Sequence, residues 1–193
     1  ILDLAQIEAD KLFLSMEILQ PSFCVKEAFS YCKERAITNN ITLSFDASGL
    51  DDVYIDVDVV RLRQCLINLV NNAIKYNVTN GEVTVSFAIE SNKFVIAVSD
   101  TGPGVAKDKQ ASLFEIFNRL GAERSSIEGS GLGLVLTEQL MLAMGGKIIY
   151  DDDATIGACF KLYFSVCEKL AAKNSAVTSQ HSNELSSVRL SFV

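Results

Sequence analysis

The sequence predicts an α+β fold, a two-layer α/β sandwich in which helices face one mixed sheet. Four long segments repeat apolar residues at helical spacing, and several shorter segments alternate apolar with polar residues as strands do. Hydrophobic residues make up 49% of the 193 residues, which is enough for one full core. Because helices and strands of this kind bury their apolar faces against each other, two packed layers are expected.

The first expected elements are two helices and a strand. Residues 2–16 carry an imperfect helical stripe of apolar side chains. A short extended stretch follows and ends at Pro21, after which Ser22 is positioned to cap a helix over 22–39. The alternation in "ITLSFDA" predicts a strand over 41–47.

The middle of the chain combines a long helix with a hairpin. Residues 52–57 are a short strand candidate, and Asp58 can cap a helix over 59–77. The segments 81–90 and 92–100 both alternate, and the polar pair Ser91-Asn92 between them favours a hairpin turn.

The last part of the chain repeats the mixture of helices and strands. A short helix is expected near 108–117, and a polar segment over 118–130 follows it. The helix expected over 131–144 is closed by a pair of glycines. Two final strands are predicted over 147–153 and 157–166.

Composition excludes several classes of function. The net charge of −7 argues against nucleic acid or an anionic membrane as a partner, and no apolar run is long enough to span a membrane. The five cysteines form no CxxC pair and His181 is the only histidine, so we expect buried reduced thiols and no zinc site. From about Glu168 the chain becomes polar and serine-rich, which is typical of a linker or disordered tail.

Gly129, Gly131 and Gly133 stand immediately before a helical segment, where unpaired N–H groups can bind phosphate. A Rossmann fingerprint would need a glycine at Leu134 and a strand before the motif, and neither is present. The Gly-Lys-Ser/Thr of a P-loop and the glycine loop of protein kinases are also absent. Taken alone, these glycines also fit a flexible loop at a helix start.

Two further motifs carry polar groups. Asn68, Asn72 and Lys75 lie on one helical stripe, which suits a hydrated magnesium ion and phosphate oxygens but also fits a solvated helix face. Asp100 ends a strand and can accept from an exocyclic amine, while Gly102 and Gly104 let a flat ring approach the backbone; an ordinary Asp-Gly turn has the same pattern.

These stretches, in this order, resemble the ATP-binding catalytic domain of sensor histidine kinases, in the group that also holds gyrase, mismatch-repair ATPases and heat-shock chaperones. The matching boxes are 68–76 (Asn box), 100–104 and 129–133 (glycine boxes) and Phe114–Phe117. The resemblance implies a Bergerat-type fold, with about five strands and three helices on one face of the sheet. It also implies that ATP and Mg²⁺ are the cofactors, and that 118–130 is a mobile lid over the triphosphate.

The resemblance also assigns expected roles. Asn72 is the expected magnesium ligand, although the neighbouring Asn71 lies close to the same stripe. Asp100 is expected to accept from adenine. The expected catalytic residues are Lys75 and Asn68, which also contact the nucleotide, and Arg119, which stabilises the transferred phosphoryl group. The remaining expected nucleotide contacts are Tyr76, Gly102, Gly104, Gly129, Gly131, Leu132, Gly133 and Leu134.

The resemblance favours phosphoryl transfer over hydrolysis. Related hydrolases carry a glutamate base at the position of Asn68, and an amide cannot take a proton. An ATP-binding regulatory module without transfer, or a gyrase-like ATPase, remains the alternative. The expected domains are 1–16, the end of a dimerisation-domain helix, then the catalytic domain over 17–167, and the linker or tail over 168–193.

The expected partners are a histidine-containing dimerisation domain and the receiver domain of a response regulator. The histidine acceptor is expected outside this chain, because no helical box surrounds His181. Without the dimerising helices, the chain is expected to be a monomer that touches neither membrane nor nucleic acid. It is expected to be cytoplasmic, either by itself or as the cytoplasmic part of a membrane-bound sensor.

Overall fold

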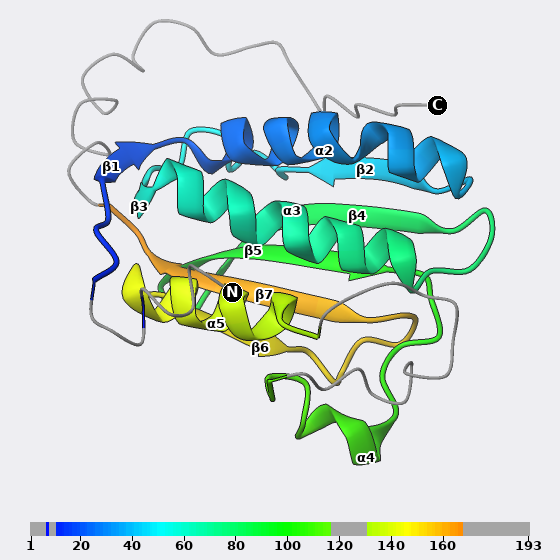
Figure 1. Cartoon of the computed structure of the whole chain (residues 1–193). Coiled ribbons are helices and arrows are strands. Elements are labelled where there is room, and N and C mark those ends of the chain that lie inside the picture. Colours follow the sequence, from blue (N-terminus) through cyan, green and yellow to red (C-terminus); the bar gives the residue numbers. More distant parts are fainter. Residues whose placement is uncertain (1–6, 8–10, 117–130, 168–193) are drawn as a thin grey trace, which may run out of the picture.

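The computed structural model describes residue 7 and residues 11–116 and 131–167 (Figure 1). The helices are α2 (Pro21–Thr38), α3 (Val59–Lys75), α4 (Lys107–Gln110) and α5 (Gly133–Ala143). The strands are β1 (Met16–Leu19), β2 (Thr42–Asp46), β3 (Ile55–Asp58), β4 (Glu82–Glu90), β5 (Lys93–Asp100), β6 (Lys147–Tyr150) and β7 (Cys159–Ser165).

The main sheet is mixed and has five strands in the order β2-β4-β5-β7-β6. The pair β2–β4 is parallel, and the other three pairs are antiparallel. The helices α2, α3 and α5 run side by side over one face of this sheet, while the short α4 lies apart from them (Figure 1). The predicted two-layer α+β sandwich is therefore confirmed.

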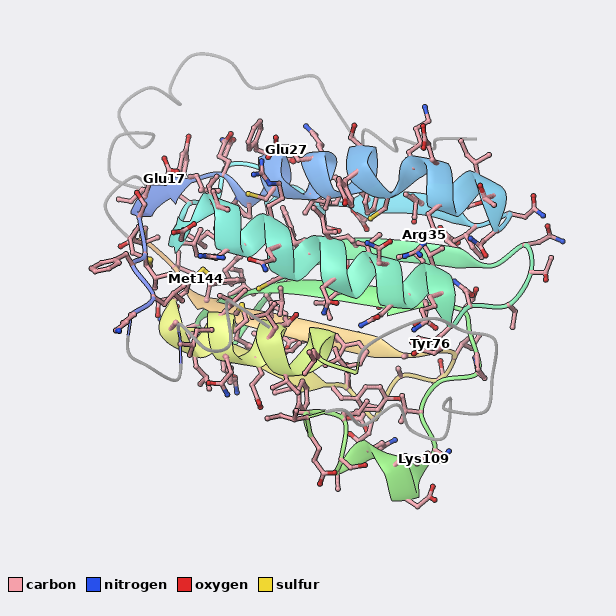
Figure 2. The ribbon with its side chains drawn as sticks, in the orientation of Figure 1. Glu17, Glu27, Arg35, Tyr76, Lys109 and Met144 are labelled. Carbon is pink, nitrogen blue, oxygen red and sulfur yellow. The ribbon has the colours of Figure 1, made fainter. Side chains whose placement is uncertain are left out.

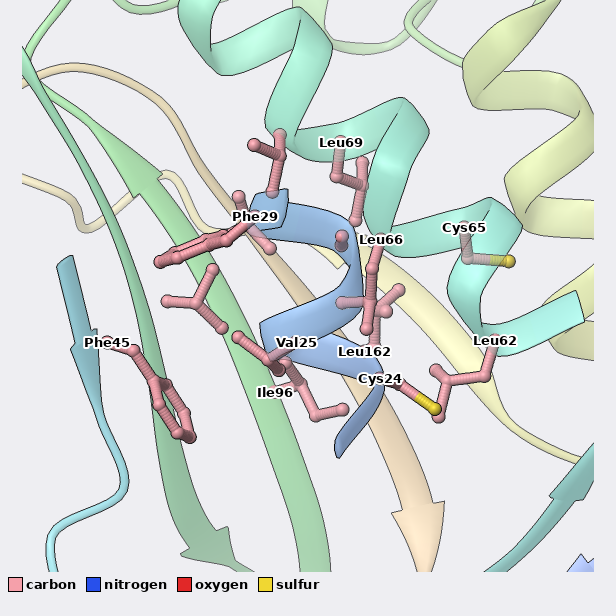
Figure 3. Packing of buried hydrophobic residues seen from close by; sticks show 14 of the residues in the cluster. Cys24, Val25, Phe29, Phe45, Leu62, Cys65, Leu66, Leu69, Ile96 and Leu162 are labelled. Carbon is pink, nitrogen blue, oxygen red and sulfur yellow. The ribbon is translucent and has the colours of Figure 1, made fainter. Parts of the chain in front are cut away.

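The core lies between the helices and the sheet. Phe29 of α2 and Leu66 of α3 pack towards Ile96 and Leu162 of the central strands (Figure 3). The helix α3 buries one side completely, because its apolar residues recur at helical spacing. All five cysteines are free, and burial raises the pKa of the Cys65 thiol to about 12, so this thiol stays protonated.

The N-terminal region differs from the sequence prediction. Residues 11–15 are not helical, and Met16 begins β1, which pairs antiparallel with β3 in a separate two-stranded sheet. The strand predicted over 52–57 therefore lies outside the main sheet. Asp58 contributes to this pairing of the N-terminal segment. Its Oδ2 accepts from the N–H of Ser15 at 2.8 Å, which holds the extended segment against the start of α3.

The other role of Asp58 is as predicted. Its Oδ1 accepts from the N–H groups of Val60 and Arg61 at 2.9 and 3.0 Å and caps α3. Ser22, in contrast, does not cap α2. The helix begins at Pro21, whose fixed φ and missing N–H suit the first helical position, and Ser22 is buried in the first turn.

The hairpin and the short helix give one confirmed prediction and one correction. Ser91 and Asn92 connect β4 to β5, and both have positive φ, as tight hairpin turns require. The helix expected over 108–117 is only the four residues of α4. Beyond it, N–H groups bond three residues back, as at Leu113 to Gln110, so the chain continues in tighter turns.

No helix in the described part of the chain is both long and apolar enough to cross a membrane. The expected lid over 118–130 and the tail over 168–193 lie outside the described residues.

Candidate functional site

A cavity of about 1370 Å³ opens where α3, the loop after β5 and the start of α5 meet. Tyr76, at the C-terminal end of α3, and Lys109, on α4, both line it (Figure 2). An apolar wall is formed by side chains from several elements. These residues are Leu69, Val98, Leu113, Leu140, Ala158 and Phe160. A cavity with a large apolar wall and a few polar groups suits a nucleotide.

The predicted polar stripe of α3 faces this cavity. Asn68, Asn72 and Lys75 all line it, because the opposite side of the helix is taken by the core. The Lys75 ammonium donates to the hydroxyl of Tyr76 at 2.8 Å and lies 4.5 Å from the centre of its ring. The positive charge of Lys75 is thus held at the C-terminal end of α3.

Asn71 and Asn72, which the sequence left as alternatives, differ in their contacts. The Oδ1 of Asn71 accepts from the guanidinium of Arg35 at 3.2 Å. Among the described residues, no group bonds the side chain of Asn72, which lines the cavity with both its amide oxygen and its NH₂ unpaired. Of these two neighbours, which both line the cavity, Asn72 is therefore the one whose amide oxygen accepts from no described group.

Asn68 is already engaged with α5. Its Nδ2 donates to Oγ1 of Thr137 at 2.9 Å, and that hydroxyl donates to the carbonyl oxygen of Gly133 at 3.0 Å. A Cβ at Gly133 would collide with Oδ1 of Asn68, so any other residue there would displace the Asn68 amide. Sequence reasoning missed Thr137, because a single threonine in a leucine-rich helix carries no motif.

Asp100 lies at the end of β5 and lines the cavity. Its Oδ1 accepts from the main-chain N–H groups of Gly102 at 2.8 Å and Ala158 at 3.1 Å. Burial raises the pKa of the Asp100 carboxyl above its ordinary value, and these two hydrogen bonds oppose the rise. The other oxygen, Oδ2, accepts from no group in the described part of the chain, so it can accept from a ligand.

The loop that holds Asp100 was only partly foreseen. Gly157 approaches the Asp100 backbone so closely that a Cβ would collide with its carbonyl oxygen. Gly104 lines the cavity, whereas Gly102 is buried and does not line it. The role of residues 157 and 158 could not be read from the sequence, because they are brought to Asp100 only by the pairing of β5 with β7.

The start of α5 forms the remaining wall. Gly131, Gly133 and Leu134 line the cavity, while Leu132 is buried and does not. No described side chain caps this helix, and main-chain N–H groups at a helix start can bind an anion. Phe114 packs against the core, as expected. The predicted site residues Arg119 and Gly129, together with Phe117, lie outside the described residues.

Comparison with known proteins gives the family. Residues 57–168 match the family described as "Histidine kinase-, DNA gyrase B-, and HSP90-like ATPase". The circadian input-output histidine kinase CikA of Synechococcus elongatus is 36% identical over 166 residues, covering 84% of this chain and 22% of that protein. The virulence sensor protein BvgS of Bordetella pertussis is 34% identical over 160 residues, covering 77% of this chain and 12% of that protein. The chain thus spans a minor part of these relatives.

Solved structures agree with this assignment. Full-length ShkA in complex with AMPPNP is 30% identical with a TM-score of 0.72, over 86% of this chain and 34% of that one. The catalytic domain of the histidine kinase ThkA shares the fold, with a TM-score of 0.68 at 24% identity, over 79% of this chain and 96% of that one. The chain therefore belongs to the histidine kinase-, DNA gyrase B- and HSP90-like ATPase family, and its likeness is to the ATP-binding catalytic domain of histidine kinases.

Proposed function

We propose that this domain binds Mg-ATP and donates the γ-phosphoryl group to a histidine of a dimerisation domain in two-component signalling. The observation that carries the proposal is that Asn68 has a neutral amide, which cannot act as a base. This residue occupies the position of the hydrolase base, but it is neutral and its amide is bonded to Thr137. Of the described residues that line the cavity, only Asp100 has a carboxylate. A base that could activate water is therefore lacking on the α3 stripe.

The residues of the cavity fit a magnesium ion. Mg²⁺ prefers oxygen ligands and keeps several waters, so one protein amide is sufficient. The unpaired amide of Asn72 offers such an oxygen, whereas that of Asn71 is taken by Arg35. When bound, the ion would neutralise part of the negative charge on the phosphate oxygens. We assign its ligand to Asn72 and a phosphate contact to Lys75.

The adenine is assigned to the end of the cavity near β5. Oδ2 of Asp100 would accept from the exocyclic amine, since Oδ1 is held by two main-chain donors. Val98, Phe160 and Leu113 supply apolar surface for the ring. The triphosphate would then extend along α3 towards the start of α5, where N–H groups and the helix dipole favour negative charge.

The transfer itself requires a nucleophile from another domain. The bond between the γ-phosphorus and the β–γ bridging oxygen breaks, a bond from phosphorus to an imidazole nitrogen forms, and ADP leaves. Positioning and charge stabilisation suffice for such a reaction, since the imidazole is itself the nucleophile. From that histidine, we expect the phosphoryl group to pass to the receiver domain of a response regulator.

The proposal is tested by mixing the purified chain with γ-labelled ATP and a separate dimerisation domain that carries its histidine. We expect slow, acid-labile labelling of that histidine. The first control replaces the acceptor histidine by glutamine, which removes the nucleophile. The second uses Asn72→Ala in this chain, which removes the assigned metal ligand.

The alternatives predict different results. A gyrase-like ATPase would release phosphate steadily with no acceptor present. A regulatory module without transfer would bind ATP but neither label the histidine nor release phosphate. Tight ATP binding without any labelled histidine would overturn the kinase proposal and leave the ATP site intact.

A further inference from the structure

Thr137 is a buried polar residue to which the proposed function assigns no role. It lies one turn into α5 and is only 1% exposed. Its hydroxyl uses both of its hydrogen-bonding functions, since it donates to the Gly133 carbonyl oxygen and accepts from Nδ2 of Asn68. The second bond joins residues that are 69 positions apart in the chain and links α3 directly to α5.

This contact determines the orientation of the Asn68 amide. With Nδ2 on the Thr137 hydroxyl, Oδ1 lies against Gly133, where a Cβ would collide with it. The middle of α3 and the first turn of α5 are therefore in direct contact at Asn68, Gly133 and Thr137. A second contact lies beside it, where the thiol of Cys65 approaches the carbonyl oxygen of Thr137 at 4.0 Å.

We propose that Thr137 is a positioning residue for the triphosphate. Through its hydroxyl it holds the first turn of α5 against Asn68, and so sets the distance between the amide stripe of α3 and the N–H groups at the start of α5. The inference rests on the proposed function, because it presumes that phosphates bind between these two helices. Thr137 also lines the cavity, but its hydroxyl is bonded to Asn68 and Gly133, so we assign it a positioning role and no hydrogen bond to the nucleotide.

The same structure predicts that the adenine end does not depend on Thr137. Asp100 is oriented by its own bonds to Gly102 and Ala158, which belong to the loops after β5 and before β7. Loss of the Thr137 hydroxyl would therefore loosen the phosphate end of the cavity and leave the adenine end in place. Affinity for the triphosphate should therefore fall while affinity for adenosine is kept, a result that a general structural role of Thr137 would not produce.

The test compares affinities for Mg-ATP and for adenosine, measured by calorimetry on the full chain. Thr137→Val keeps the shape of the side chain but leaves Nδ2 of Asn68 without an acceptor. We expect about a tenfold loss of Mg-ATP affinity and at most about a twofold change for adenosine. Thr137→Ser restores the hydroxyl and should restore Mg-ATP affinity.

A matched control is Thr84→Val on β4. The hydroxyl of Thr84 also makes one side-chain hydrogen bond, to Ser44 at 2.8 Å, but Thr84 alternates with the core-facing Val83 and Val85 and so points to the other face of the sheet. This variant should leave both affinities unchanged. If Thr137→Val does not fold, Thr137→Ala removes the same hydroxyl and carries the same comparison.

Three outcomes would overturn the inference. Equal Mg-ATP affinity in Thr137→Val and the unaltered protein would show that the bond does not position phosphates. Equal losses for Mg-ATP and adenosine would show that Thr137 supports the whole cavity instead. Absence of Mg-ATP binding by the unaltered protein would remove the proposed function as well, which distinguishes that failure from the first two.

Discussion

The main-chain N–H of Ala158 donates to Oδ1 of Asp100 at 3.1 Å, although the two residues are 58 positions apart in the chain. Together with Gly102, this donor occupies one oxygen of the carboxylate, and no described group donates to the other oxygen. The loop before β7 thereby orients the carboxylate to which we assign adenine.

Asp100→Asn tests the assignment of adenine to this carboxylate. An asparagine that keeps its oxygen towards Ala158 and Gly102 presents an NH₂ where the carboxylate accepts, so it faces the amine of adenine with a second donor. We expect the affinity for both ATP and adenosine to fall about tenfold or more, as measured by calorimetry. The control Asp152→Asn makes the same change of charge on the exposed turn between β6 and β7. Equal affinities of the two variants would refute the assignment.

The neighbouring asparagines of α3 allow a paired test of the metal site. Asn72→Ala should lower the affinity for ATP in the presence of Mg²⁺, because it removes the unpaired amide oxygen. Asn71 also lines the cavity, but its amide oxygen already accepts from Arg35, so Asn71→Ala should retain this affinity. Chelation of the metal with EDTA should weaken ATP binding by the unaltered protein and by Asn71→Ala, and should change Asn72→Ala little. If EDTA weakens Asn72→Ala as strongly as the unaltered protein, the ligand is another residue.

Asp58 combines the cap of α3 with the attachment of the N-terminal segment. Asp58→Ala removes the acceptor of Val60, Arg61 and Ser15, and we expect it to lower the free energy of unfolding in urea by about 2 kcal/mol. Asp58→Asn retains a capping oxygen but cannot also accept from Ser15, so its loss should be smaller. If both variants lose the same free energy, the bond to Ser15 contributes the larger share.

A pH dependence is expected at Glu90. The Tyr163 hydroxyl donates to its Oε2 at 2.6 Å, and this bond, with the Lys161 ammonium, lowers the pKa of Glu90 from its ordinary value of 4.5. Because the folded pKa is the lower one, the stabilisation is complete above the ordinary value and is lost as the pH falls through the folded pKa.

Tyr163→Phe removes the donor and measures this effect. The unaltered protein should unfold in urea with a higher free energy than the variant at neutral pH, and the difference should shrink as Glu90 becomes protonated. Tyr31→Phe serves as the control, since Tyr31 is 72% exposed and its hydroxyl makes no bond among the described residues. A difference that stays constant from neutral to acid pH would contradict the prediction.

Local patterns predicted most of the fold. Helical spacing located α2, α3 and α5, and alternation located the strands of the main sheet. The pairing of β1 with β3 was not predictable, because four-residue strands carry too little pattern to specify a partner. The length of α4 was overestimated, because apolar spacing does not distinguish an α-helix from successive tight turns.

The sequence by itself determined the family, the polar stripe of α3 and the carboxylate at the end of β5, because each depends on residues close together in the chain. Only the tertiary structure shows that Arg35 bonds Asn71 and not Asn72, that Oδ1 and not Oδ2 of Asp100 accepts from Ala158, and that Asn68 donates to Thr137. Each of these depends on a partner from another element, namely Arg35, Ala158 or α5 itself. Hydrogen bonds between distant segments form only once the sheet and helices have packed, so no local pattern contains them.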